Sequence, residues 1–321
     1  MKSQGLQSVT SAIDVTASVR ILLRELIDFA GLFPPASLTM AQSLADYDSY
    51  LRWEFGWILG RLIVPLSRLT EFEAAFARLP ALAGDDGASC WRLSVILGTD
   101  ANADIARIRE FNGRMDRLTS GTPSSSRKAV VDSVEVRVTG AEEVRRLSEI
   151  IPQEFSAYFE IPIVNCGENI AAVASCRRRA KIRTGGETED NFPSAANVVE
   201  FIRLCAKSDV PFKATAGLHH PLRSVHKLTY QSDSPSGMMH GFINIFLAAA
   251  FVKAGMEEEL AVRLLQEQSP EAFRFDSTGV EWRGHRLRAD QLADTRQQFS
   301  VSFGSCSFTE PIDDLRLLRL L

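Results

Sequence analysis

Cysteine is scarce in this sequence, and no two cysteines stand close enough together to form a CxxC pair. The chain of 321 residues has five, an odd number: Cys90, Cys166, Cys176, Cys205 and Cys306. This set predicts neither a disulfide framework nor a zinc site, and it indicates a reducing compartment. The first residues are polar and lack the charged-then-apolar pattern of a secretory signal. We therefore expect a cytoplasmic protein.

Excess positive charge and long apolar runs are missing as well. The formal net charge is −4, without the basic stripe typical of a nucleic-acid-binding surface. No uncharged apolar run reaches the roughly 18 residues of a membrane span. Neither the glycine fingerprint of dinucleotide-binding folds nor a Walker loop is present, so no nucleotide cofactor is implied. We expect a soluble protein that acts without a cofactor, a nucleic acid or a membrane.

Strand-like and helix-like segments alternate from about residue 25 onward, which predicts βα units and a parallel sheet. The predicted strands are 26–30, 61–66, 91–97, 132–138, 156–163, 180–184, 212–216 and 300–307. Eight strands in a chain of this length favour a single (β/α)8 TIM-type barrel over residues 1–321.

One stretch interrupts the alternation shortly before the last strand. We expect residues 222–298 to form a helical and hairpin insertion, packed on or over the barrel, with a small hairpin within 273–286. The apolar segment 242–252 is a candidate lid or homo-oligomer contact, and packing inside the core is the alternative.

Charged residues recur inside four of the predicted strands, although burying an unpaired charge is costly. Successive side chains of a strand point to opposite faces, so the charged residues mark the face that looks into the barrel lumen. The set predicted to share the lumen is Glu135, Arg137, Glu160, Lys181, Arg183 and Lys213. A neutralised ion-pair network that only fills the barrel is one interpretation. Buried ion pairs are often no better for stability than apolar packing, so we favour a functional site.

Two of these residues are lysines in similar surroundings. Residues 180–186 read AKIRTGG and residues 211–217 read PFKATAG, with an amphipathic helix expected at about 194–208 between them. A buried lysine tends to lose its charge, and a neutral amine attacks carbonyl carbons. Like-charge repulsion from Arg183 and Lys213 would keep Lys181 neutral.

These motifs resemble the deoxyribose-phosphate aldolase group of class I aldolases, which are (β/α)8 barrels that form a lysine Schiff base. The similarity extends to YFE at 158–160 and to FGSCS at 303–307, which is similar to the phosphate-binding turn of that group. It covers about residues 130–217 and 300–307. Residues 218–221, which read LHHP, and the long segment before the last strand differ from that pattern.

The resemblance implies a role for particular residues. Lys181 would be the Schiff-base nucleophile, and Lys213 the neighbouring cation that lowers its pKa. Asp132 would correspond to the catalytic aspartate at the start of the fourth strand. Gly304 and Ser305 would offer backbone N–H groups to an anionic substrate. Strand parity places Asp132 on the face opposite Glu135, which makes Glu135 the alternative acid.

We therefore expect a class I aldolase-like carbon–carbon lyase that acts on a small anionic carbonyl substrate. Glu160, Glu135 or Asp132 would move protons as the general acid and base. The residues expected to bind substrate are Arg183, Arg137, His219, His220, Gly304 and Ser305.

Two other functions remain open. In the first, His219 or His220 combines with Glu160, and with His240, as the metal ligands of a lyase or hydrolase. In the second, the barrel binds a small anion or a partner without catalysis.

Overall fold

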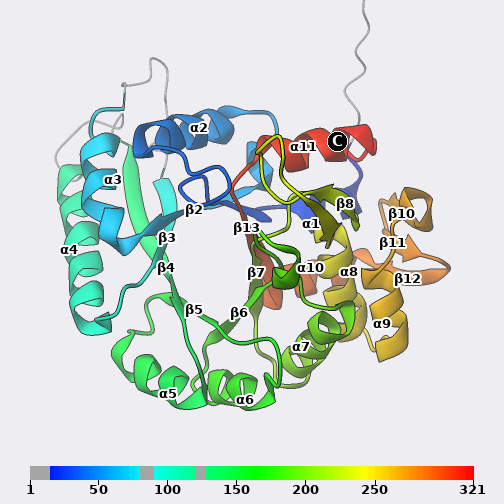
Figure 1. The fold of residues 1–321 in the computed structure, drawn as a ribbon. Coiled ribbons are helices and arrows are strands. Elements are labelled where there is room, and N and C mark those ends of the chain that lie inside the picture. The colour runs from blue at the N-terminus through cyan, green and yellow to red at the C-terminus, as the bar shows by residue number, and fades with distance from the viewer. Residues whose placement is uncertain (1–14, 80–89, 120–126) are drawn as a thin grey trace, which may run out of the picture.

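Eight parallel strands close into a barrel in the computed structural model, which describes residues 15–79, 90–119 and 127–321 (Figure 1). Around the barrel the strands follow the order β1-β13-β7-β6-β5-β4-β3-β2. Their bounds are β1 Ile27–Phe29, β2 Leu59–Pro65, β3 Cys90–Ile96, β4 Lys128–Arg137, β5 Ser156–Glu160, β6 Arg179–Arg183, β7 Phe212–Thr215 and β13 Ser300–Ser305. Each coincides in large part with a predicted strand. The predicted (β/α)8 TIM-type barrel is confirmed.

Helices ring the outside of the barrel (Figure 1). The α-helices are α1 Ala17–Leu23, α2 Met40–Arg52, α3 Leu69–Phe76, α4 Ala101–Thr119, α5 Ala141–Ile150, α6 Gly167–Ser175, α7 Ala195–Lys207, α8 Phe242–Lys253, α9 Glu258–Leu265, α10 Ala289–Gln298 and α11 Thr309–Leu317. Short 3-10 helices occur at Gly56–Ile58, Leu66–Arg68, Glu189–Asn191 (η3) and Pro270–Ala272. No helix among the described residues is long and apolar enough to cross a lipid bilayer.

The alternation of side chains along β6 and β7 separates the apolar exterior of the barrel from its charged interior. Ile182 and Phe212 are buried, and Phe212 meets Phe201 of α7 edge-on with 5.4 Å between ring centroids. Lys181 and Lys213 carry the opposite parity and are register partners on the two strands. Ile182 and Phe212 therefore face the surrounding helices, whereas Lys181 and Lys213 face the lumen of the barrel.

The segment after β7 contributes two small sheets. Strands β8 (Ser224–Lys227) and β9 (Ser236–Met239) pair antiparallel, and β9 contacts η3. Strands β10 (Phe273–Asp276), β11 (Gly279–Trp282) and β12 (His285–Arg288) form a three-stranded antiparallel sheet that contacts α1 and α10. The predicted hairpin at 273–286 is confirmed, and it carries a third strand.

Helix α8 is apolar around most of its circumference because it is enclosed by other elements. Residues 242–251 are all buried, and the helix contacts α7, α9, α10 and β13. A helix that is apolar on every side belongs in a protein interior. Core packing, one of the interpretations of this segment, is what the structure shows.

The glycines that follow β6 and β7 allow the two loops to touch. Gly217 has φ +71°, a conformation that favours glycine, and a Cβ placed on it would lie 2.7 Å from Gly185 Cα. Thr184 Oγ1 donates a hydrogen bond to the carbonyl of Ala216 at 2.7 Å. The threonine–glycine pattern after each lysine strand therefore has a local structural cause, since it lets the two loops pack at the barrel mouth.

Candidate active site

A cavity of about 620 Å³ opens at the carboxyl ends of the barrel strands. Residues from each of the eight strands, or from the loop that directly follows it, line its wall. The β8–β9 hairpin also borders it, through Leu228 and Met239. Active sites of (β/α)8 enzymes lie at this end of the barrel, where the βα loops can supply different chemistry.

The two lysines are joined by a single carboxylate at the base of this cavity. Lys213 Nζ lies 2.6 Å from Glu135 Oε1, and Lys181 Nζ lies 2.7 Å from Glu135 Oε2. Each ammonium has a second acidic partner. Glu160 Oε2 is 2.8 Å from Lys181, and Asp28 Oδ2 is 2.6 Å from Lys213. Lys213 is 1% exposed and Lys181 4%. Of the two, Lys181 lines the cavity.

Burial and ion pairing have opposite effects on the pKa values of these linked acidic and basic side chains. Burial alone would raise the pKa of Glu135, but Lys181 and Lys213 outweigh it and hold the pKa well below its usual range. Burial alone would lower the pKa of Lys213, but Asp28 and Glu135 outweigh it and raise the pKa above its usual value. Glu160 behaves like Glu135, because Lys181 and Arg183 lower its pKa against the effect of burial. Glu135, Glu160 and Lys213 are therefore ionised near neutral pH.

The predicted activation of Lys181 by like charges does not match these contacts. Glu135 lies between Lys181 and Lys213, and Glu160 lies between Lys181 and Arg183, whose Nε donates to Glu160 Oε1 at 3.0 Å. Each neighbouring cation is thus separated from Lys181 by a carboxylate. A proton that leaves Lys181 has an acceptor within hydrogen-bonding distance on either side.

Asp28 was missed by the sequence reasoning, although it is buried and central to the site. Its carboxylate accepts hydrogen bonds from Lys213 Nζ, from Ser302 Oγ at 2.8 Å and from the Arg61 backbone N–H at 2.7 Å. The signal was a lone acid in the apolar strand 26–30, the same signal that identified the charged residues of the other strands. Ser94 was also missed; its hydroxyl donates to Glu135 Oε1 at 2.7 Å.

Asp132 does not line the cavity. Its carboxylate contacts Arg61 Nε at 2.6 Å and Arg92 Nε at 3.0 Å, near the amino ends of β2 and β3. The pairing of β3 with β4 shifts register between Leu93 and Ser94, opposite Asp132. Asp132 therefore lies within this irregularity, where it contacts the two arginines. Glu135 is the β4 acid that stands beside the lysines, as strand parity indicated.

The two adjacent histidines pair with helix α11 and do not meet Glu160. His219 Nδ1 lies 3.0 Å from Glu310 Oε2, and His220 Nδ1 lies 2.6 Å from Asp314 Oδ2. His240 Nε2 is 2.8 Å from the carbonyl of Pro193. Within the described part of the chain, no group of three or more His, Cys, Asp or Glu side chains is arranged to hold a metal ion. His219 alone of these histidines lines the cavity.

Gly304 and Ser305 occupy different positions relative to the cavity. Gly304 lies in its wall, and a Cβ there would approach Ile63 Cδ1 at 3.0 Å and Thr215 Oγ1 at 3.4 Å. Ser305 is buried, and its carbonyl accepts a hydrogen bond from the Ala30 N–H at 2.7 Å. The predicted role of their backbone N–H groups in binding an anion stays a prediction.

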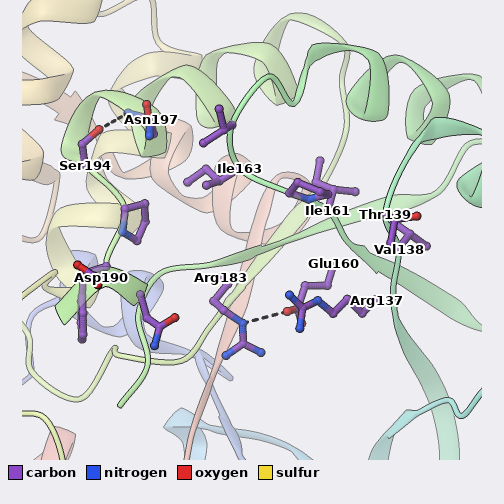
Figure 2. Close-up of a pocket in the computed structure, with 15 residues that line it drawn as sticks. Arg137, Val138, Thr139, Glu160, Ile161, Ile163, Arg183, Asp190, Ser194 and Asn197 are labelled. Atoms are coloured by element: carbon purple, nitrogen blue, oxygen red, sulfur yellow. Dashed lines mark hydrogen bonds and ion pairs between the residues drawn. The ribbon is translucent and has the colours of Figure 1, made fainter. Parts of the chain in front are cut away.

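A second cavity, of about 560 Å³, adjoins the first. The two share Arg137, Glu160, Arg183 and Asn191 as lining residues. Figure 2 shows Arg183 reaching Glu160, with Arg137 beside that pair. Apolar residues of the loop after β5, with Phe192 and Pro193, form much of the remaining wall. Arg137 and Arg183 thus stand together where the two cavities meet.

No protein-family profile matches this chain, and no curated protein or solved structure is significantly similar to it. The fold is established by the strand order of the chain itself, as a closed, all-parallel barrel. The similarity to the deoxyribose-phosphate aldolase group is confined to the motifs given above.

Proposed function

We propose that this protein is a class I aldolase-like lyase that forms a Schiff base between Lys181 and a small anionic carbonyl compound. One observation carries the proposal. Lys181 lines the cavity, and its ammonium group lies within hydrogen-bonding distance of two carboxylates, Glu135 and Glu160. A lysine that serves only to fill the barrel has no need of an open cavity beside it.

Glu160 is the acceptor we assign for the Lys181 proton. Both oxygens of Glu135 are held by the two buried lysines, whereas Glu160 contacts Lys181 through one oxygen and the exposed Arg183 through the other, and it lines both cavities. Glu135 is also held by Lys213, which in turn pairs with Asp28, so these three charged groups keep their positions next to the reacting amine. Placing a proton acceptor within about 2.6–3.2 Å of the proton it takes is the geometric requirement for general base catalysis.

The reaction then follows the chemistry of an amine and a carbonyl. The neutral Lys181 amine adds to the carbonyl carbon, a C–N bond forms, and the carbinolamine loses water to give an iminium. Glu160 then takes the proton of the β-hydroxyl group, the Cα–Cβ bond breaks, the β carbon leaves as the carbonyl carbon of an aldehyde or ketone, and the electron pair of the broken bond passes into the iminium to form an enamine. Glu160 then returns a proton to the α carbon, and water hydrolyses the imine to release the product.

The metal-dependent alternative lacks its required arrangement. It needs His219 or His220 near Glu160, and the structure pairs these histidines with Glu310 and Asp314. The Glu160 carboxylate is itself occupied by Lys181 and Arg183. We therefore do not propose a metal centre.

Borohydride trapping tests the proposal. The protein is incubated with a panel of aldehydes and keto acids, reduced, and weighed intact by mass spectrometry, with Lys181→Ala as the test variant. Lys207→Ala is the matched control, because Lys207 is an exposed lysine at the end of α7. We expect one reduced adduct in wild type and in the control, none in Lys181→Ala, and no change when a chelator is present. Loss of the adduct on chelation, or its persistence without Lys181, would overturn the proposal.

A further inference from the structure

The residues shared by the two cavities include two arginines, Arg137 and Arg183, and one carboxylate, Glu160, while Glu187 and Asp190 each line one cavity. The side chain of Arg137 makes no hydrogen bond or ion pair in the described part of the chain, and the side chain of Arg183 uses only its Nε, for Glu160. In contrast, Asp28, Glu135 and Glu160 already contact Lys181, Lys213 and Arg183. The free guanidinium of Arg137 and the Nη groups of Arg183 therefore remain available to a ligand.

The strand register brings these groups together. Arg137 is the register partner of Glu160, which is in turn the register partner of Lys181. Figure 2 shows Arg137, Glu160 and Arg183 gathered at one end of the second cavity. Guanidinium groups bind carboxylates and phosphates through paired hydrogen bonds, and they do so more strongly when the donors are not already used.

We propose that the substrate bears an oxyanion, a carboxylate or a phosphate, that binds Arg137 and Arg183, and that its apolar remainder extends into the second cavity. This inference rests on the proposed function, since it places the reacting carbonyl at Lys181. Only the Glu160 carboxylate separates Lys181 from Arg183. The oxyanion therefore lies a few bonds from the carbonyl, as in a short keto acid or an aldehyde phosphate.

The walls of the second cavity indicate what the rest of the molecule is like. Val138, Ile161, Ile163 and Val164 line it, and Val164 is 62% exposed, a large value for an apolar side chain. An apolar group placed there removes this surface from water. A bound oxyanion also offsets the positive charge of Arg183, which lowers the pKa of Glu160 at present, so that Glu160 becomes a better acceptor for the Lys181 proton.

Matched probes separate the oxyanion from the carbonyl. Glyoxylate is paired with acetaldehyde, and glycolaldehyde phosphate with glycolaldehyde, and borohydride trapping gives an adduct rate for each. Binding of inorganic phosphate and of acetate is measured independently by calorimetry. The variants are Arg137→Gln, Arg183→Gln and Arg137→Lys, with Arg145→Gln as control because Arg145 is exposed on α5 and lines neither cavity.

In wild type we expect the charged member of at least one pair to be trapped faster, and the better pair distinguishes carboxylate from phosphate. Loss of a charge-assisted contact should reduce that preference, and the affinity for the matching anion, about tenfold in Arg137→Gln and Arg183→Gln. Arg137→Lys should restore part of both, and Arg145→Gln should change neither. 2-Oxohexanoate should be trapped faster than pyruvate, and Val164→Asp should remove that difference.

Each failure has a distinct meaning. Equal trapping of charged and neutral probes in wild type, or unchanged anion affinity in Arg137→Gln, overturns the oxyanion site and leaves the Schiff base standing. Equal trapping of 2-oxohexanoate and pyruvate overturns the apolar extension. Absence of any adduct, together with anion binding that depends on Arg137, keeps the oxyanion site and overturns the proposed function.

Discussion

Lys181 and Lys213 are register partners on β6 and β7, and the two oxygens of one carboxylate, Glu135, each contact one of their ammonium groups. The three side chains come from three strands and are almost fully buried. Burial makes each charge depend on its partners, because an unpaired charge in such a place is costly. The site and the stability of the barrel are therefore linked through the same contacts.

Replacing Lys213 should destabilise the protein. Lys213→Met leaves Asp28 and Glu135 buried without their shared cation, and removal of one partner of a buried pair typically costs about 3–5 kcal/mol. Urea unfolding measures the change. The double variant Lys213→Met/Asp28→Asn should recover part of the loss, because it removes the stranded charge. A loss as large in the double variant as in the single one would contradict this explanation.

The free energy of unfolding should fall in acid and in strong alkali. Ion pairing lowers the pKa of Glu135 in the folded state despite burial, so its contribution is present above the ordinary value of 4.5 and is lost as the pH falls toward the folded value. The pKa of Lys213 is raised despite burial, so its contribution is present below the ordinary value of 10.5 and is lost as the pH rises toward the folded value.

Urea unfolding at a series of pH values measures this dependence. Between about pH 5 and 3 the free energy of unfolding should fall less in Glu135→Gln than in wild type. The reason is that the unfolded variant has no carboxylate at residue 135 to take up a proton in this range. Glu259→Gln, a change at an exposed glutamate on α9, serves as the control. An acid loss of equal size in all three proteins would show that Glu135 does not contribute.

The barrel and most of its charged lumen were predictable from the sequence because both depend on short-range periodicity. Alternating apolar and charged residues on β4 to β7 gave the strands, the parity and the lysine pair. Asp28 was overlooked although it obeys the same rule, since β1 is only three residues long and offers little pattern.

Other features could not be read from local sequence. The register shift beside Asp132 depends on how β3 pairs with β4, which no single strand specifies. His219 and His220 pair with acidic residues of α11, which lies far along the chain. Because these pairings are long-range, the local sequence could not show them, and the two histidines remained candidate metal ligands. The resemblance assigned Asp132 by its place in a motif, whereas the geometry favours Glu135.

The contact between the loops after β6 and β7 should require glycine at residue 217. Gly217→Ala meets two penalties, a positive φ of +71° and a Cβ 2.7 Å from Gly185 Cα. The left-handed conformation alone costs about 1–2 kcal/mol. Gly284→Ala measures the cost of the left-handed conformation alone, because the φ of Gly284 is +83° and nothing lies within 4 Å of the added Cβ. Thermal unfolding should show a clearly larger loss of stability for Gly217→Ala than for Gly284→Ala. Equal losses of stability would exclude the close contact with Gly185 as a cause.

The β8–β9 hairpin should loosen in mild acid. The ring of His226 on β8 stacks on His220, with 3.3 Å between ring centroids. Burial, and then the neighbouring His220, lower the pKa of His226, while Asp314 and Glu310 act in the opposite direction. A lowered histidine pKa means that stability is present above the ordinary value of 6.5 and is lost as the pH falls through it.

Hydrogen exchange, corrected for its intrinsic pH dependence, measures this opening. The amides of residues 224–239 should exchange faster at pH 5.5 than at pH 7.5, and those of the central barrel strands should not. His226→Phe keeps an aromatic ring against His220 without a titrating group, so its exchange should depend less on pH. The same pH dependence in that variant would assign the effect to other groups.

The proposed Schiff base predicts one particular modified residue. Peptide mapping of the wild-type protein after incubation with a trapped carbonyl and borohydride identifies which lysine carries the reduced adduct. The adduct should lie on Lys181, because this residue lines the cavity, and Lys213, which is buried and paired with Asp28 and Glu135, should be unmodified. An adduct on Lys213 or on exposed lysines alone, or none with any carbonyl of the panel, would contradict the proposed role of Lys181.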